Sequence, residues 1–399
     1  MKIVLCGLLI MFSIMMHGVS QSLPDSSNLQ ANGTMLLKKT TMVSQKSIHT
    51  PFSILEPFIF PDSVSYYKRW WHVIPRDIPA TPFSNTNTIT SVFESELYRL
   101  NAWTINLSEM YLLYWQTVEK VRECVVSKGI GKFSINDLPI ATGKIVEQYG
   151  LIPNEHYEGV YRGKVQYNLA AMYRDIECYL RFVSKVEKWN DSVVVNCVKS
   201  IMGFHIGHPP STFKWNNQTI TPVEFYKQTG ITNDYVLLMS DLAFPLNKKI
   251  NPSPKRNYPD SVYNISLDYL IYQVRDALER GYSVIIITDS TEQGFNRNGR
   301  YAVVSEYDIP NTGITQYARQ LRLNNKNTTA DNLFHLVGFL ESEGEYWYLI
   351  KDTSFNPLFS NNYGDEAGYI FFREDYIKLK TTGIVLLKSS AEAAINKTK

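Results

Sequence analysis

The four cysteines are the strongest nucleophiles that the chain could offer. Cys6 lies close to the N-terminus, and the others are Cys124, Cys178 and Cys197. No two of them form a Cys-x-x-Cys pair, which argues against a zinc or dithiol site. Cys124, Cys178 and Cys197 all lie in apolar, helix-like stretches, so we expect buried and inert thiols. A bridge between Cys178 and Cys197 stays open as an alternative in an oxidising compartment.

Histidines and carboxylates offer a few further candidates. His205 and His208 lie three residues apart, but a glycine and a proline break the helix there, so we predict no metal site and no cofactor. His72 follows two tryptophans and is expected to pack against them. Asp289 ends an apolar run, where it is either a binding residue beside a cleft or the anchor of a turn.

The first 20 residues have the pattern of a signal peptide. Lys2 precedes an apolar run that is too short to span a bilayer, and small residues suitable for cleavage lie near Ser20. Residues 21–50 are rich in Ser, Asn, Thr and Lys and predict a flexible leader. No later segment is long and apolar enough for stable membrane insertion. We therefore expect an exported protein, periplasmic or extracellular after removal of the signal peptide.

The charge balance argues against a polyanionic partner. The 40 basic and 38 acidic residues give a net charge of +2, which provides no electrostatic reason to bind nucleic acid. The hydrophobic content of 44% and charged content of 20% are normal for a globular protein of 399 residues. Seven Asn-x-Ser/Thr sequons are present, one of them at Asn264, and they are possible glycan sites.

Helical patterns dominate the chain up to about residue 205. Apolar residues recur at helical spacing, and Ser108 and either Asn190 or Asp191 are suitable N-caps. The predicted helices cover residues 89–100, 107–127, 137–149, 165–189 and 191–203. The polar run Ser84–Thr90, which precedes the first of them, is poor in helix formers.

Strand patterns dominate the rest of the chain. Residues 212–221 predict a hairpin that turns at Asn216 and Asn217. The continuous apolar run at 282–289 predicts a strand buried on both faces. Further strands are predicted at 235–239, 333–352 (a hairpin), 367–373 and 383–388, and a helix at 267–280. A helix-rich half followed by a strand-rich half predicts an α+β fold with two lobes.

Several motifs, taken in order, resemble the papain-like cysteine peptidases. The branch of bleomycin hydrolase and its bacterial aminopeptidase C-like relatives is the most similar. The stretches that carry the resemblance are FESELYRL at 93–100, LSEMYLLYWQTVEKVRE at 107–123, IVEQYGLIPNEHYEG at 145–159, PPSTFKWNNQTITPVEFYKQTG at 209–230, RGYSVIIITDSTEQGF at 280–295, ADNLFHLVGFLESEGEYWYLIKDTSF at 330–355 and GYIFFREDYIKLKTTGIVLLK at 368–388.

The resemblance implies a helical lobe, a β-barrel-like lobe and a cleft between them. It also implies three catalytic positions: a Cys that opens the central helix, a His that deprotonates it and an Asn that orients the His. In this chain those positions hold Ser84, Asn332 and Asp352, and Asn85 occupies the place of the Trp beside the nucleophile. The Gln that would supply an oxyanion donor has no counterpart: either its loop is deleted or, without a deletion, its position falls on Ile78.

No other residue in the sequence is an evident replacement for the missing nucleophile or the missing base. An amide at Asn332 cannot take a proton at neutral pH. His335 is the tempting substitute, but residues 332 and 335 of one strand point to opposite faces. A serine hydroxyl at Ser84 needs an adjacent base to react. The resemblance therefore predicts the fold without the peptidase chemistry.

We expect a papain-like domain over residues 51–388, with a helical lobe at about 80–205, a β-rich lobe at about 206–388 and a tail at 389–399. The expected function is that of an inactive relative that binds a peptide or protein in its cleft, with Ser84, Asn85, Asp289, Asn332 and Asp352 as candidate binding residues. An active aminopeptidase or hydrolase with a rearranged site is the first alternative. A structural component of a homo-oligomer is the second.

Overall fold

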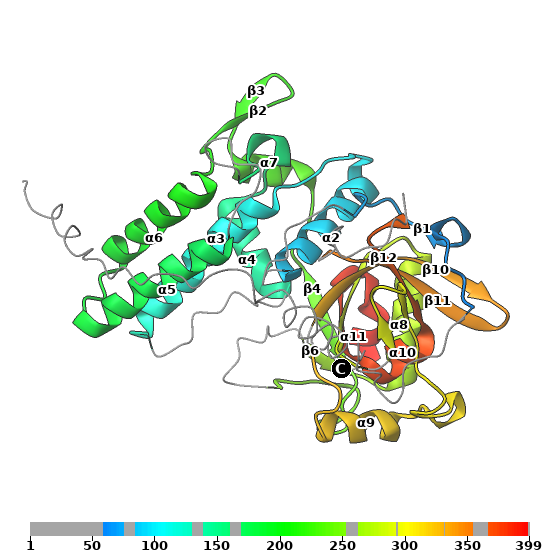
Figure 1. The fold of residues 1–399 in the computed structure, drawn as a ribbon. Coiled ribbons are helices and arrows are strands. Elements are labelled where there is room, and N and C mark those ends of the chain that lie inside the picture. Colours follow the sequence, from blue (N-terminus) through cyan, green and yellow to red (C-terminus); the bar gives the residue numbers. More distant parts are fainter. Residues whose placement is uncertain are drawn as a thin grey trace, which may run out of the picture. The chain divides into compact units, whose positions relative to one another are not determined.

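The computed structural model describes residues 59–75, 84–129, 139–159, 169–252, 262–292, 294–330, 332–353 and 366–397. All of them belong to one compact unit, Phe52–Lys399. The predicted signal peptide (1–20) and leader (21–50) lie outside the described residues. Helices come first along the chain and most strands follow (Figure 1).

The described helices up to residue 229 are α2 (Ser84–Asn101), α3 (Glu109–Val126), α4 (Pro139–Tyr149), α5 (Leu169–Val186), α6 (Asp191–Ile206) and α7 (Pro222–Thr229). Helices α3 to α6 lie close to their predicted bounds, whereas α2 begins at Ser84, five residues before its predicted start at residue 89. The Ser108 hydroxyl accepts the N–H of Tyr111, and the Asn190 side chain accepts the N–H of Val193, so both predicted caps are present. The predicted hairpin consists of β2 (Phe213–Trp215) and β3 (Gln218–Ile220). Asn216 and Asn217 form its turn, with φ of 48° and 64°.

A large mixed sheet forms the second half. Its order is β5-β6-β4-β13-β7-β10-β11-β12-β9-β8, and β1 pairs with β10. The strands are β1 (Lys68–Arg69), β4 (Tyr235–Met239), β5 (Lys248–Lys249), β6 (Val262–Asn264), β7 (Val284–Thr288), β8 (Phe295–Asn296), β9 (Tyr301–Ala302), β10 (Asn332–Ser342), β11 (Glu345–Lys351), β12 (Tyr369–Arg373) and β13 (Thr381–Leu387). The predicted α+β class is confirmed. In the residues that the structure describes, the β-rich part is an open sheet with two ends, not a closed barrel.

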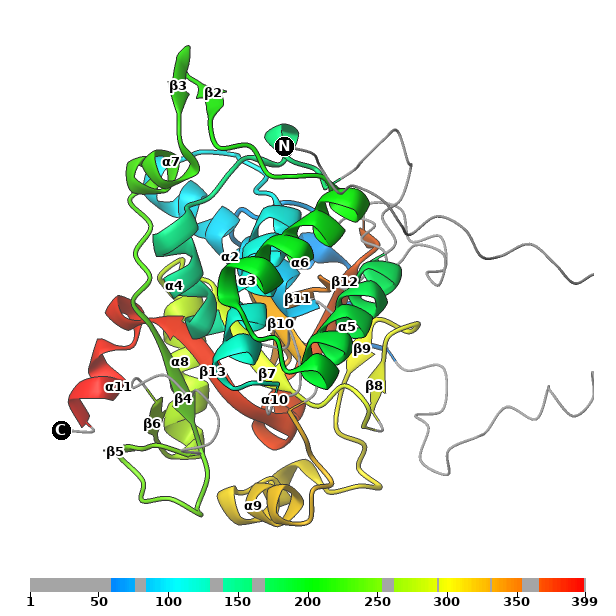
Figure 2. The same cartoon turned by 90° about the vertical axis from the view of Figure 1, so that its left-hand side faces the viewer.

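Both faces of the sheet are covered. Along β7, Ile285 and Ile287 join a core that also holds residues of α2, α3 and α6. Val284 and Ile286 face the opposite core, which holds residues of α8 (Leu267–Glu279), α10 (Glu374–Lys380) and α11 (Glu392–Lys397). Figure 2 shows α8 and α11 beside β4 on that side. The prediction that this strand is buried on both faces is confirmed.

Four of the described helices in the C-terminal half, α7, α9 (Gln316–Asn324), α10 and α11, were not predicted from the sequence. Helix α9 turns polar side chains inward, and Arg319 is 0% exposed, so no apolar stripe announces it. Helix α11 lies within the stretch 389–399, which the sequence suggests is a tail. Ala394 and Ile395 of this helix are buried in the core beside α8.

The cysteine prediction is only partly right. Cys124 is buried, and burial raises the pKa of its thiol. Cys178 and Cys197 are exposed, because they fall on the outer faces of the amphipathic helices α5 and α6. All three are free thiols, so the alternative bridge between Cys178 and Cys197 is absent.

The sequon residue Asn264, at the end of β6, is 0% exposed. Its amide nitrogen donates to the backbone carbonyls of Asp241, Phe244 and Pro245, at 2.8, 2.9 and 3.1 Å. Its side-chain oxygen accepts the N–H of Asp241 at 2.9 Å. Asn264 therefore fastens the loop that follows β4.

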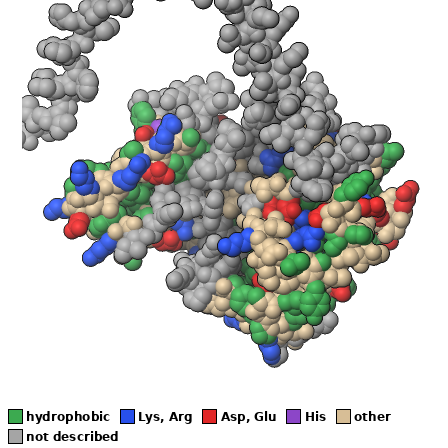
Figure 3. Space-filling view, turned by 60° about the horizontal axis from the view of Figure 1, so that its bottom comes forward, with side chains coloured by type: hydrophobic (Ala, Val, Ile, Leu, Met, Phe, Trp, Pro, Cys, Tyr) green, Lys and Arg blue, Asp and Glu red, His purple; other side chains and the backbone are tan. Residues whose placement is uncertain are grey.

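The described surface carries mixed charge. On the face shown in Figure 3, Lys and Arg side chains alternate with Asp and Glu. Among the described helices, none is long and apolar enough to cross a membrane. No group of three or more His, Cys, Asp or Glu side chains in the described ranges could hold a metal ion. His205 instead contacts Asp175 of α5, with 2.8 Å between Nε2 and the carboxylate.

Candidate functional site

The polar first half of α2 is buried, and its side chains are hydrogen-bonded. Thr86 donates to Gln116 Oε1 of α3 at 2.6 Å, and Thr90 donates back to the carbonyl of Thr86 at 2.8 Å. Buried polar side chains are tolerated when such partners exist. The helix can therefore start at Ser84 although the polar run has a weak helix propensity, because the hydrogen bonds to other elements outweigh the cost of that propensity.

Helix α2 meets the sheet at the positions that the resemblance assigns to catalysis. Thr88 Oγ1 donates to the carbonyl of Leu333 at 3.1 Å and lies 2.6 Å from Thr353 Oγ1. Asn87 donates to the carbonyl of Thr353 at 3.1 Å. Leu333 and Thr353 directly follow Asn332 and Asp352 in the chain, and Ser84 precedes Thr88 by about one helical turn. Backbone segments from three elements thus converge here.

Asn332, at the position of the base, is the first residue of β10 and is paired with Thr288 of β7. Its amide nitrogen donates to the Ser290 hydroxyl. This contact turns the side chain toward the loop after β7. An amide in this position can donate and accept hydrogen bonds, but it cannot act as a general base.

Asp352, at the orienting position, follows the last residue of β11. Its side chain is 2% exposed, and its carboxylate lies 3.4 Å from Nε of Arg297. Its backbone N–H donates to the carbonyl of Gly368 at 2.8 Å. The carboxylate therefore has a cationic partner in Arg297.

Asp289 anchors a turn beside Asn332. One carboxylate oxygen accepts the N–H and the hydroxyl of Thr291, both at 2.8 Å. The other accepts the N–H of Thr329 at 2.8 Å and its hydroxyl at 3.2 Å. With a side chain that is 1% exposed, Asp289 fits the turn-anchor alternative. Asn85 is half-buried in the first turn of α2.

A second cluster with chemical potential lies deeper along α2, and the sequence did not reveal it. Ser91 Oγ lies 2.9 Å from His335 Nδ1 and accepts a hydrogen bond from Lys351 Nζ at 2.7 Å. Because Lys351 only donates, the Ser91 hydroxyl can still donate to His335 Nδ1, which is the arrangement of a serine beside a base. The available signal was the recurrence of Thr88 and Ser91 three residues apart on one helix face.

Burial keeps the histidine of this cluster in its neutral form. His335 is 0% exposed, and burial, with Lys351 and His72 nearby, lowers its pKa well below the ordinary 6.5. Glu94 partly balances Lys351 at 3.8 Å and accepts the N–H of Leu107 at 3.0 Å. Ser91 is 2% exposed, so the cluster is a buried polar network between the helix and the sheet.

His72 belongs to the same neighbourhood. Its Nδ1 lies 2.7 Å from the carbonyl of Trp70, and its Nε2 lies 2.7 Å from the Tyr369 hydroxyl. A carbonyl only accepts, so Nδ1 carries the proton and Nε2 accepts from tyrosine. Burial is the main cause that lowers the pKa of His72 to about 4. The expected packing role of His72 thus includes two hydrogen bonds.

Two surface depressions lie elsewhere in the described residues. The larger, of about 610 Å³, is lined by residues of α8 and α11, and the smaller, of about 200 Å³, lies beside α10. Asn85, Asp289, Asn332 and Asp352 are not among the described residues that line them.

No protein-family model and no curated protein sequence matches this chain. Among solved structures, PepW from Lactobacillus rhamnosis HN001 superposes with a TM-score of 0.58 at 14% identity, over 93% of this chain and 92% of that one. A structure of the mite allergens Blo t 1 and Der p 1 gives a TM-score of 0.40 at 12% identity, over 84% of this chain and 75% of the other. SERA5E from Plasmodium falciparum gives a TM-score of 0.38 at 10% identity, over 79% of this chain and 88% of the other.

The fold is assigned from the superposition on PepW, because that superposition spans nearly the whole of both chains. This protein has a papain-like two-lobed fold, as the motifs predicted. Within that class its fold is similar to that of PepW. At 14% identity the likeness extends to the fold, and the chemistry has to be argued from this chain's own residues.

Proposed function

We propose that this protein is an exported papain-fold pseudopeptidase that holds a peptide or protein segment at the start of α2 without cleaving it. One observation carries the proposal. The nucleophile, base and orienting positions hold Ser84, Asn332 and Asp352, and the last two side chains bind Ser290 and Arg297. A thiol, an imidazole and an amide would be needed in their places.

The chemistry supports the loss of peptidase function. No cysteine occurs between residues 25 and 123, so α2 cannot present a thiolate. A serine at position 84 is weak without a base, and Asn332 cannot provide one. Loss of such a catalytic unit lowers turnover by roughly 10⁶, which leaves binding as the function that the fold can still perform.

Incubation with a degenerate peptide library tests both halves of the proposal. Mass spectrometry of the retained and free peptides should find bound peptides that are intact. Asn85→Trp, which places a large ring at the start of α2, should weaken retention, whereas Ser200→Trp on the exposed face of α6 should not. Cleaved peptides would contradict the inactive site, and the absence of any retained peptide would contradict the binding function.

Export is part of the same proposal and rests on the N-terminal residues. The chain should leave the cytoplasm and lose its first 20 residues or so. Intact-mass measurement of the protein recovered from the periplasm or the medium checks the new N-terminus. A full-length chain that stays in the cytoplasm would contradict this part alone.

The alternative of an active hydrolase has one observation in its favour, the hydrogen-bonded Ser91, His335 and Lys351. Against this alternative, Ser91 is only 2% exposed, so a substrate could not reach its hydroxyl in this structure. Fluorogenic aminoacyl and peptidyl substrates distinguish the two functions. Hydrolysis that Ser91→Ala abolishes would establish the alternative, and hydrolysis that only Ser84→Ala abolishes would place the reaction at the start of α2.

A further inference from the structure

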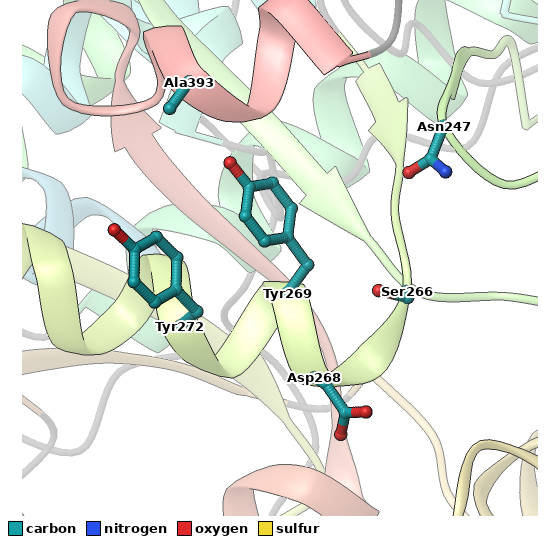
Figure 4. A pocket seen from close by; sticks show the side chains of 6 residues that line it. All are labelled: Asn247, Ser266, Asp268, Tyr269, Tyr272 and Ala393. Carbon is teal, nitrogen blue, oxygen red and sulfur yellow. The ribbon is translucent and has the colours of Figure 1, made fainter.

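The depression of about 610 Å³ lies on the opposite side of the sheet from the candidate site. It is lined by Asn247, by Ser266, Asp268, Tyr269 and Tyr272 of the start of α8, and by Ala393 of α11 (Figure 4). Helix α8 covers one face of the sheet and α2 lies on the other. The volume suits a small organic ligand or a few sugar rings.

Two tyrosines form its aromatic wall. Tyr269 and Tyr272 lie three residues apart on α8, with ring centroids 5.6 Å apart and planes that differ by 9°. Figure 4 shows both rings on the same side of the helix, with their hydroxyl ends toward α11. Tyr272 is 52% exposed. The two rings thus stack on each other, Tyr269 packs against the core, and the exposed Tyr272 ring is accessible to a ligand.

The polar lining adds hydrogen-bonding groups of both kinds. The Asn247 amide both donates and accepts, the Ser266 hydroxyl does the same, and Asp268 accepts. Ser266 occupies the N-cap of α8, but its hydroxyl makes no capping bond. The N–H of Leu267 binds Gln316 Oε1 instead, at 2.7 Å. The Ser266 hydroxyl is therefore not needed to cap the helix.

The charge of the lining narrows the ligand class. Among the described lining residues, Asp268 is the single carboxylate and none is a Lys or Arg. This disfavours phosphate and other anions. A wholly apolar ligand would leave the amide, hydroxyl and carboxylate without partners on binding. A neutral molecule with many hydroxyl groups and flat C–H faces satisfies both the rings and the polar groups.

We propose that this depression binds neutral oligosaccharide, with a sugar ring against the exposed Tyr272 ring and its hydroxyl groups bound to Asn247, Ser266 and Asp268. Such a site would let the protein attach to a glycan while the start of α2 engages a different ligand. It does not depend on the proposed peptide binding, because the two sites lie on opposite faces of the sheet.

The test uses the full chain and three neutral trisaccharides: maltotriose, cellotriose and triacetylchitotriose. Saturation-transfer NMR and calorimetry should detect binding of at least one of them at millimolar concentration. Tyr272→Ala should weaken it by about fivefold or more, the size expected for one aromatic contact. Tyr317→Ala is the matched control, because Tyr317 is 78% exposed on α9 and is not among the lining residues.

A second variant protects the test against misfolding. Asp268→Asn keeps the shape of the side chain and should also weaken binding, with an unchanged thermal transition. The proposal is overturned if no trisaccharide binds, or if Tyr272→Ala and Tyr317→Ala have equal effects. It is also overturned if a proline-rich peptide binds to these tyrosines and the sugars do not, since that would make the aromatic surface a peptide site.

Discussion

At the scale of single residues, His72 and His335 should make the protein sensitive to acid. The pKa of His72 is about 4 in the folded state and near 6.5 in the unfolded chain, so the unfolded chain binds the proton first as the pH falls. The contribution of neutral His72 to the free energy of unfolding is fully present above pH 6.5. It is lost as the pH falls toward 4, which lowers the stability by about 3 kcal/mol for His72 alone. His335 acts in the same direction.

Urea unfolding at pH 7 and pH 5 measures this dependence. His72→Gln keeps a donor and an acceptor for Trp70 and Tyr369, and should flatten the pH dependence. His208→Gln, at an exposed position, should leave it unchanged. Equal slopes for the wild type and His72→Gln would show that His72 does not cause the effect.

Lys351 and Glu94 form the buried ion pair of this region, 6% and 1% exposed. Lys351→Met should cost about 3 kcal/mol or more, because it leaves the Glu94 carboxylate buried without its cation. The double variant Lys351→Met/Glu94→Gln should recover part of that loss. A double-mutant cycle, with each variant measured by urea unfolding, gives the interaction free energy between Lys351 and Glu94. Arg181→Met breaks an exposed pair with Glu177 and serves as the control, with an expected change of at most about 0.5 kcal/mol.

The sequence motifs around Glu94, Gly338 and Lys351 were enough to propose Ser84, Asn332 and Asp352 as the catalytic positions, which remains a prediction. The network of Ser91, His335 and Lys351 could not be named from the sequence. Its three residues come from α2, β10 and β11, and only the packing of the helix on the sheet brings them together. Strand alternation did predict that His335 faces away from Asn332, but not which residue it meets.

At the scale of elements, α9 is held by polar contacts instead of an apolar stripe. The buried Arg319 guanidinium donates to the carbonyls of Ser240 and Thr381, and burial lowers its pKa to about 10. Arg319→Met should cost about 3 kcal/mol and raise hydrogen exchange in α9. Hydrogen-exchange mass spectrometry checks it, with Tyr317→Ala on the outer face as the control. Unchanged protection of α9 in Arg319→Met would contradict this assignment.

The predictability of each element follows from its stabilising interactions. Elements with apolar periodicity or local caps, such as α3 with Ser108 and β7, were predictable within a few residues. The start of α2 was not, because Thr86, Asn87 and Thr88 are stabilised by hydrogen bonds to other elements. Propensity describes the isolated segment and contains no term for such partners.

At the scale of the whole molecule, one core joins the helical part to the sheet. Phe93 of α2 is 2% exposed and shares that core with Ile287 and Leu333. Phe93→Ala should cost about 3–5 kcal/mol and lower the stability of helices and sheet together. Unfolding followed by far-UV circular dichroism and by tryptophan fluorescence should give coincident transitions. Separate transitions would mean that the two parts unfold independently.

The burial of Asn264 has a consequence for the order of events during biosynthesis. An enzyme that modifies Asn-x-Ser must reach the side chain before β6 joins the sheet, since afterwards three carbonyls occupy the amide. In a host that attaches glycans to nascent chains, folding and modification would compete at this residue, and a chain modified first could not close the loop after β4. Ser266→Ala removes the competition and leaves Asn264 in place. It should raise the secreted yield in such a host and leave the yield in a bacterium unchanged.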